Sequence, residues 1–109
     1  MFVDDDPGMA IPREEIFAPV VTIIACANVD EAVAIAKDAD HGLAGSLRTQ
    51  DVDRAVELSA RIHTDAMAIN SFGCQPCTPF GGVKGRGIGR EGGPEGLDAY
   101  LWSQSVLGV

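Results

Sequence analysis

The sequence predicts an α/β fold with the element order β-α-β-α-β, followed by a glycine-rich loop and a C-terminal strand. Three observations predict it: short apolar runs alternate with stretches of helical periodicity, a capping residue precedes each of those stretches, and glycine gathers late in the chain. Strands that are joined through helices run parallel, with right-handed crossovers. We therefore expect a parallel core of three strands flanked by two helices.

The first strand is expected over residues 20–27, a continuous apolar and β-branched run typical of strands that are covered on both faces. Residues 1–18 are expected to be irregular, because several prolines interrupt them, with Phe2 and Val3 as the stub of a strand. Cys26 lies within the apolar run. We expect it to be a buried core residue rather than a nucleophile, since burial in apolar surroundings makes a thiol inert.

The first helix is expected to begin at Asn28. Asn28 and Glu31 have the spacing of a capping box, in which the two side chains satisfy free backbone N–H groups at the start of a helix. Gly42 is expected to end this helix. One apolar face is formed by Val29, Ala32, Val33 and Ala36.

A second strand is expected over residues 43–49, after which Thr49 or Asp51 caps the second helix. The third strand is expected over residues 66–71. The apolar face of the second helix is formed by Val52, Ala55, Val56, Ser59 and Ile62.

Eight of the thirteen glycines lie between residues 81 and 96, and this density predicts a shaped loop rather than a packed element. Residues 87–92 match the pattern GxGxxG, but no strand leads into them and too few residues follow for a dinucleotide-binding unit. We interpret them as part of the loop. A short helix over residues 95–100 and a terminal strand over residues 100–109 are expected to follow.

Eight Lys and Arg residues against sixteen Asp and Glu residues give the 109-residue chain a net charge of −8. This charge excludes nucleic acid and anionic membrane surfaces as partners, because both bind basic surfaces. No apolar run is long enough to span a membrane, and the first residues do not resemble a signal peptide. Three cysteines, an odd number, are typical of a reduced protein. We therefore predict a cytoplasmic location.

Cys74 and Cys77 form a CxxC pair, which is half of a zinc site. No second pair accompanies it, since His41 and His63 stand alone and His63 is expected to cap a helix. We expect no metal and interpret the two thiols as lining a loop. A small redox or metal protein that uses this pair is an alternative.

Lys84, Arg86 and Arg90 lie within seven positions of the glycine-rich loop. Two interpretations of these cations remain open. They belong either to a solvated loop or to ion pairs with the acidic residues near the N-terminus, which are Asp4, Asp5, Asp6, Glu14 and Glu15.

Three further stretches occur in register along the chain. Residues 14–20 read EEIFAPV, residues 41–51 contain HGLA followed by TxD, and residues 79–91 read PFGGVKGRGIGRE. They resemble the EEIFGPV, YGLxAxVxTxD and PFGGxKxSGxGRE segments of the NAD(P)-dependent aldehyde dehydrogenase superfamily. The resemblance includes Asn70, Gly96, Leu97 and Tyr100 and extends over nearly the whole chain.

This resemblance implies a single partial domain. Residues 1–98 correspond to the C-terminal part of the catalytic domain and residues 99–109 to the oligomerisation strand. Glu15 resembles the carboxylate that accepts hydrogen bonds from the nicotinamide ribose, and Phe17 the aromatic residue beside the nicotinamide ring. Phe80 resembles an aromatic residue of the substrate pocket. The implied cofactor is NAD or NADP.

Departures from the family pattern qualify this implication. The family's catalytic Cys, its general-base Glu and its dinucleotide-binding domain all lie upstream of EEIFGPV, and no cysteine of this chain matches the nucleophile. Ala18 replaces a Gly, with strain expected if φ is positive there; His41 replaces a Tyr and Arg86 a Ser.

We therefore predict a fragment that resembles an aldehyde-oxidising enzyme but is inactive alone, with no catalytic residue and no cofactor bound by the chain itself. Its expected partner is another copy or a full-length relative. The alternative is a structural or oligomerisation module that pairs with itself or with such a relative through the terminal strand.

Overall fold

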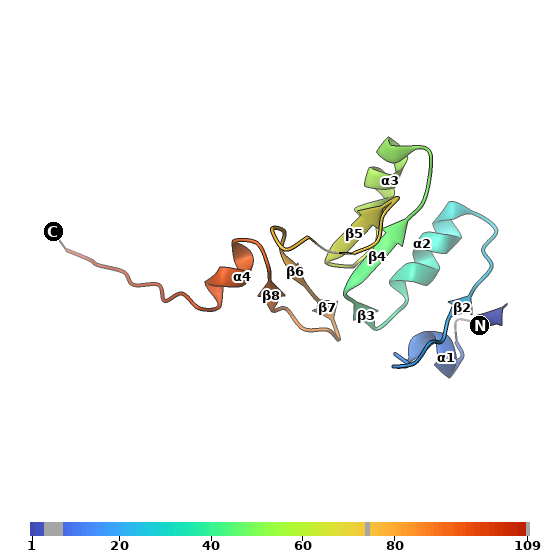
Figure 1. Cartoon of the computed structure of the whole chain (residues 1–109), viewed down its shortest axis with the longest axis horizontal. Helices are drawn as coiled ribbons and strands as arrows, with labels where there is room; N and C mark the ends of the chain where they lie inside the picture. The colour runs from blue at the N-terminus through green and yellow to red at the C-terminus, as the bar shows by residue number, and fades with distance from the viewer. Residues whose placement is uncertain (4–7, 74, 109) are drawn as a thin grey trace.

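A computed structural model describes residues 1–3, 8–73 and 75–108 and shows a mixed α/β body (Figure 1). The helices are α1 (Ala10–Arg13), α2 (Val29–Lys37), α3 (Val52–Ser59) and α4 (Glu95–Asp98). The strands are β1 (Phe2–Val3), β2 (Thr22–Ile23), β3 (His41–Gly42), β4 (Ala44–Leu47), β5 (Ala66–Ile69), β6 (Phe80–Gly81), β7 (Val83–Lys84) and β8 (Arg90–Glu91).

The strands pair two by two. β4 and β5 lie parallel with α3 as their crossover, in the register Ala44↔Ala66 to Leu47↔Ile69. β1 pairs with β2 in parallel, whereas β3 pairs with β7 and β6 with β8 in antiparallel fashion. Figure 1 shows α2 and α3 beside the β4–β5 pair, with β6, β7 and β8 between that pair and the C-terminal segment.

The predicted three-stranded parallel core is wrong for the described residues, because β2 pairs with β1 and not with β4. Only Thr22 and Ile23 of the expected strand over residues 20–27 are in a ladder, since β1 offers two residues to pair with. One face of the run, with Val20, Thr22 and Ile24, is half-buried, and the opposite face is exposed. Cys26, predicted to be buried, is exposed, and so is Ile23.

Asn28 caps α2 as predicted. Its Oδ1 accepts a hydrogen bond from the Glu31 backbone N–H at 2.9 Å, and the Glu31 carboxylate accepts one from the Ala27 N–H at 2.7 Å. This arrangement is similar to a capping box, except that Glu31 accepts from Ala27, the residue before the cap, and not from Asn28 itself. α2 ends at Lys37 rather than near Gly42.

The cap of α3 is Asp51, one of the two predicted residues, and its Oδ1 accepts from the Arg54 N–H at 3.0 Å. The Thr49 hydroxyl accepts in turn from the Asp51 N–H at 3.1 Å. α3 ends at Ser59, before the predicted face reaches Ile62. The short helix α1 was not predicted, because a proline lies inside it.

Residues 81–96 were predicted to form a shaped loop. This is wrong in part, because the short strands β6, β7 and β8 lie in or next to this range. Glycine permits their close approach. A Cβ at Gly81 would lie 2.1 Å from the carbonyl oxygen of Gly89. The expected helix over residues 95–100 is confirmed as the shorter α4.

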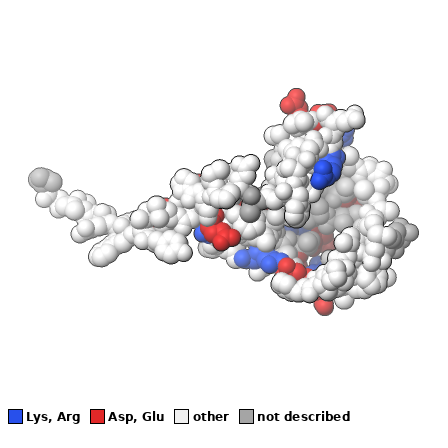
Figure 2. Space-filling view, viewed as in Figure 1, with Lys and Arg blue, Asp and Glu red and all other residues white. Residues whose placement is uncertain are grey.

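The C-terminal segment extends away from the body and carries no strand over residues 101–108 (Figure 1). The predicted terminal strand is therefore not formed here, since a strand requires a partner for its backbone groups. The segment is apolar and exposed. Its exposed residues include Leu101, Trp102, Val106 and Leu107. Figure 2 shows this arm free of charged side chains.

Little of the described chain is fully buried, with Val33 and Ala55 as its buried hydrophobic residues. The radius of gyration is 17.6 Å, whereas a compact domain of this length would have about 13 Å. Large side chains such as Phe17, Phe72 and Ile88 are about nine-tenths exposed. Among the described residues, no helix is long and apolar enough to cross a membrane.

The substitution Gly42→Ala tests how closely β3 packs against the backbone of His63. A Cβ there would lie 2.5 Å from the His63 carbonyl oxygen, which is backbone and cannot move away freely. We expect Gly42→Ala to lower the free energy of unfolding by about 1–3 kcal/mol, measured by urea denaturation followed by circular dichroism. Gly89→Ala is the control, because its Cβ would meet open space. Equal effects of the two substitutions would contradict this account of β3.

Candidate functional site

Two segments carry the predicted site residues. Residues 14–19, which we call the Glu15 segment, follow α1 and carry Glu15 and Phe17. Residues 79–91, which we call the glycine-rich segment, carry Phe80 and the three cations. The structure brings these two segments together through an ion pair between Glu15 Oε1 and Arg86 Nη2.

The Glu15 segment has no regular secondary structure. Its Ala18 N–H donates to the Ile16 carbonyl at 2.7 Å, and the Val20 N–H donates to the Ala18 carbonyl at 2.7 Å, so the segment follows two consecutive tight turns. Phe17 is 91% exposed. The expected strain at Ala18 is absent, because Asn70 and Lys84 are the described non-glycine residues with positive φ.

Arg13 anchors the chain just before the Glu15 segment. Its guanidinium lies 2.7 Å from Asp38 and 3.7 Å from Asp40, at the end of α2. The hydrogen bond from Arg13 to Asp38, together with the charges of both carboxylates, raises the pKa of Arg13 above its ordinary value.

The three cations of the glycine-rich segment all find partners, and the ion-pair interpretation is confirmed for Arg86 and Glu15. Asp4, Asp5 and Asp6 lie outside the described residues. Lys84 instead donates from Nζ to the carbonyl oxygens of Lys37 at 2.7 Å and Ala39 at 2.8 Å. It therefore caps the C-terminal end of α2, where a cation is favourable.

Arg90 and Asp65 form the least exposed ion pair, with side-chain exposures of 27% and 13%. Their charged atoms lie 2.8 Å apart, and the other oxygen of Asp65 accepts from the Gly81 N–H at 2.8 Å. Arg90 Nη1 also donates to the carbonyls of Gly82, Ile88 and Gly89. Asp65 thus holds together the start of β5, β6 and β8.

Phe80, the predicted substrate-pocket residue, directly precedes Gly81. The hydrogen bond from the Gly81 N–H to Asp65 therefore holds the backbone next to Phe80. Its side chain is half-buried and lines an open cavity of about 680 Å³. The remaining walls come from β4, from β5 with Met67, from Asp65, and from a following stretch that includes the exposed Phe72. The lining residues of that stretch are Ser71, Phe72, Gly73, Gln75, Thr78 and Pro79. The cavity has an apolar floor with a few polar groups, as small-molecule sites do.

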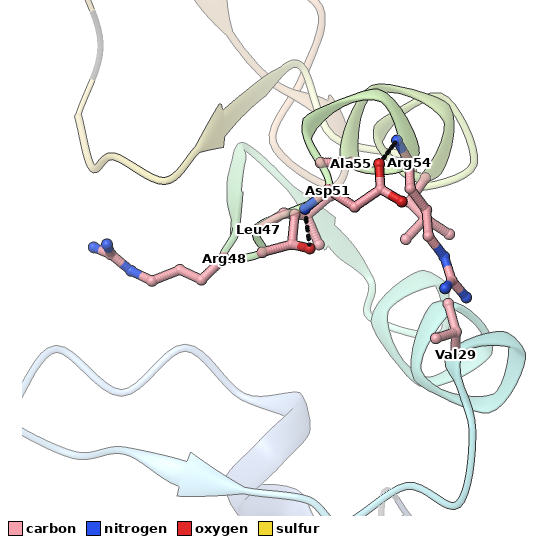
Figure 3. Close-up of a pocket in the computed structure, with 8 residues that line it drawn as sticks. Val29, Leu47, Arg48, Asp51, Arg54 and Ala55 are labelled. Carbon is pink, nitrogen blue, oxygen red and sulfur yellow. Dashed lines mark hydrogen bonds between the residues drawn. The ribbon is translucent and has the colours of Figure 1, made fainter.

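A second cavity of about 250 Å³ lies between the start of α2 and α3 and contains none of the predicted site residues. Figure 3 shows Val29, Leu47 and Ala55 at its walls, with the Arg48 side chain directed away from them. Three charged residues, Arg48, Asp51 and Arg54, line it, and Asp51 is occupied in capping α3. We interpret it as a gap between two helices.

The described cysteines, Cys26 and Cys77, are exposed thiols, whereas Cys74 lies outside the described residues. His41 and His63 are exposed as well. Among the residues that the structure describes, no group of three or more His, Cys, Asp or Glu side chains is arranged to hold a metal ion.

Sequence reasoning missed Asp65 and the structural role of Asn70. Asn70 has a φ of 53°, and its side-chain amide pairs with the backbone of Thr49, accepting at 2.9 Å and donating at 2.8 Å. This extends the β4–β5 pair by side-chain contacts. An asparagine at the end of a strand is a weak signal for such a conformation, and no pattern pointed to Asp65.

The geometry defines an α/β protein that presents an exposed carboxylate and aromatic ring beside a glycine-rich segment bordering an apolar cavity. The family model described as "Aldehyde dehydrogenase family" matches residues 1–106. The chain belongs to the aldehyde dehydrogenase family.

Relatives agree with this assignment. Geranial dehydrogenase of Castellaniella defragrans is 45% identical over 106 residues, which are 97% of this chain and 22% of that protein. A putative aldehyde dehydrogenase of Staphylococcus haemolyticus is 41% identical over 99% of this chain and 23% of its own length. The chain thus spans about a fifth of the length of the curated relatives it matches.

Solved structures match as well. The Mycobacterium tuberculosis aldehyde dehydrogenase complexed with NAD+ is 46% identical, with a TM-score of 0.87 over 90% of this chain and 20% of that one. Betaine aldehyde dehydrogenase from Staphylococcus aureus in complex with NAD+ is 38% identical, with a TM-score of 0.90 over 94% of this chain and 20% of that one.

Asp65→Ala tests the arrangement around Phe80. It removes the acceptor of the Gly81 N–H and the partner of Arg90 together, so we expect a loss of about 2 kcal/mol in the free energy of unfolding. The matched control is Asp30→Ala, whose ion pair with Arg61 is far more exposed and contributes no more than about 1 kcal/mol. Urea denaturation measures both, and equal losses would contradict a special role for Asp65.

Proposed function

We propose that this chain supplies part of the cofactor and substrate sites of an NAD(P)-dependent aldehyde dehydrogenase, corresponding to the C-terminal part of its catalytic domain, and has no dehydrogenase activity by itself. The observation that carries this proposal is the ion pair that places Glu15, two residues before Phe17, next to the glycine-rich segment. Residues 1–98 would contribute to the catalytic domain and residues 99–109 to association between subunits.

Glu15 and Phe17 are suited to the nicotinamide end of NAD or NADP. The Glu15 carboxylate is 38% exposed and can accept a hydrogen bond from a ribose hydroxyl. Phe17, two residues on and almost fully exposed, offers a ring face to an aromatic group. The bound cofactor would supply hydride acceptance, and these residues would fix its position.

Phe80 borders the cavity that we assign to the aldehyde. Its half-buried ring adds apolar surface beside Met67, which suits the carbon chain of an aldehyde. Oxidation in this family further needs a thiolate that attacks the aldehyde carbon, and a base. None of the three cysteines matches the family's nucleophile, so both groups would come from outside this chain.

The activity test compares the chain with a chimera in which it replaces the matched segment of geranial dehydrogenase. We expect the chain alone to form no NADH or NADPH with any member of an aldehyde panel, because it lacks the nucleophile. We expect the chimera to be active. Turnover by the chain alone that disappears in Cys26→Ser would overturn the proposal.

In the chimera, Glu15→Gln tests the ribose contact. A hydrogen bond to a charged acceptor contributes about 1.5–3 kcal/mol, so we expect KM for the cofactor to rise by about tenfold or more. Glu14→Gln is the matched control, since it removes an equal charge from the neighbouring exposed position. An unchanged KM in Glu15→Gln, or an equal rise in both variants, would remove Glu15 from the cofactor site.

A second function, association with another copy or a full-length relative, is favoured by the exposed apolar arm over residues 100–107. An extended segment of this kind can add a strand to a sheet edge of a partner, which would satisfy its backbone groups and cover its side chains. We propose this pairing as the role of residues 99–109.

Trp102 reports on this pairing, because it is the single tryptophan of the chain and is 87% exposed. We expect its fluorescence maximum to shift to shorter wavelength with rising protein concentration, in parallel with a rise in sedimentation coefficient. Leu101→Asp should abolish both changes, whereas Gln104→Asp, which adds the same charge at a polar position, should alter them less. A monomer with an exposed Trp102 at all concentrations would contradict self-association.

A further inference from the structure

We propose that Arg86 is a positioning residue that holds the Glu15 segment against the glycine-rich segment. The inference rests on the proposed function, which assigns Glu15 and Phe17 to the cofactor and Phe80 to the substrate. Arg86 would thereby couple the placement of the cofactor residues to the placement of the substrate residue.

The Glu15 segment has few other ties. Its backbone hydrogen bonds are local turns and one bond from Glu14 back to α1. Ile16 and Phe17 are exposed, so apolar packing contributes little to its position. Among the described residues, the ion pair with Arg86 is the one side-chain hydrogen bond or ion pair that joins this segment to the rest of the molecule.

Arg86 itself is firmly placed on the glycine-rich segment. Its backbone N–H donates to the Val83 carbonyl at 3.2 Å. Gly82 is buried beneath it, and a Cβ at Gly82 would lie 2.3 Å from the Arg86 Cβ. Gly82 follows Phe80 by two positions. The cation that binds Glu15 is therefore attached to the stretch of backbone that carries Phe80.

The burial and charge of Arg86 indicate that its ion pair with Glu15 holds the two segments together, and we call this ion pair the tether. The Arg86 side chain is 27% exposed, and its Nε is buried with no hydrogen-bond partner among the described residues. A guanidinium partly removed from water in this way depends on a carboxylate partner, which Glu15 provides. Arg86 Nη2 contacts Oε1 of Glu15, and the Glu15 side chain is 38% exposed, so the carboxylate can accept a further hydrogen bond from a ribose hydroxyl.

The tether depends on a residue at which this sequence departs from the family motif. The corresponding position of the family motif is a Ser, which has neither the charge nor the length to reach a carboxylate on another segment. Arg86→Ser therefore restores the motif residue while removing the proposed interaction, which makes it an informative variant.

Amide hydrogen exchange on the chain tests the tether without any cofactor. We expect Arg86→Ser to raise the exchange rates of the hydrogen-bonded amides of Ala18 and Val20 severalfold and to leave those of β4 and β5 unchanged. The double variant Glu15→Arg/Arg86→Glu reverses the pair and should restore slow exchange. Arg54→Ser is the control, since it removes an exposed arginine that makes no recorded ion pair. If the isolated chain exchanges completely, the same comparison is made in the chimera.

Unchanged exchange in Arg86→Ser would overturn the proposal. So would a double variant that remains as fast as Arg86→Ser, because Arg86 would then act through its packing on Gly82. In the active chimera, Arg86→Ser should raise KM for the cofactor severalfold with a smaller change in kcat, whereas mere loss of folded protein would lower kcat alone. The exchange comparison uses no cofactor, so it can reject the tether while Glu15 remains a ribose ligand. The KM comparison of Glu15→Gln can likewise reject the ribose contact while the tether stands.

Discussion

The glycine-rich segment has too few side chains to hold itself in place by packing, and its three cations do so instead. Lys84, Arg86 and Arg90 each contact a different part of the chain, and together they fix where this segment lies. A glycine-rich backbone has much conformational freedom to lose on folding, so these contacts offset a large entropic cost. The position of Phe80, and the approach of residues 14–19, both depend on them.

Outside this segment the molecule is held by one local unit, the β4–β5 pair with α3 across it. Ala55 is almost completely buried there, whereas β2 and the arm leave apolar side chains in contact with water. Exposed apolar surface of this extent is characteristic of interfaces.

Interactions between residues that are close in the sequence were predicted, whereas most of those between distant residues were not. The helix caps at Asn28 and Asp51 were predicted because capping is settled within four residues. The partner of β2 was not, since the choice between β1 and β4 is made by distant parts of the chain. The family was predicted from the sequence motifs, and the ion pair of Arg86 with Glu15 was one of two interpretations left open. Asp65 was missed because no local pattern identifies a carboxylate that accepts from a backbone N–H sixteen positions away.

The different sequence separations of the contacts also order the steps of folding. The side-chain bridge between Thr49 and Asn70 closes a loop of 21 residues, whereas Lys84 reaches back 47 residues to the end of α2. Loop-closure entropy rises with length, and short-range contacts form sooner. The β4–α3–β5 unit is thus suited to act as the nucleus, onto which the glycine-rich segment docks later. During synthesis the β4–α3–β5 unit would emerge from the ribosome before the stretch that bears Phe80, so it can fold before that stretch docks.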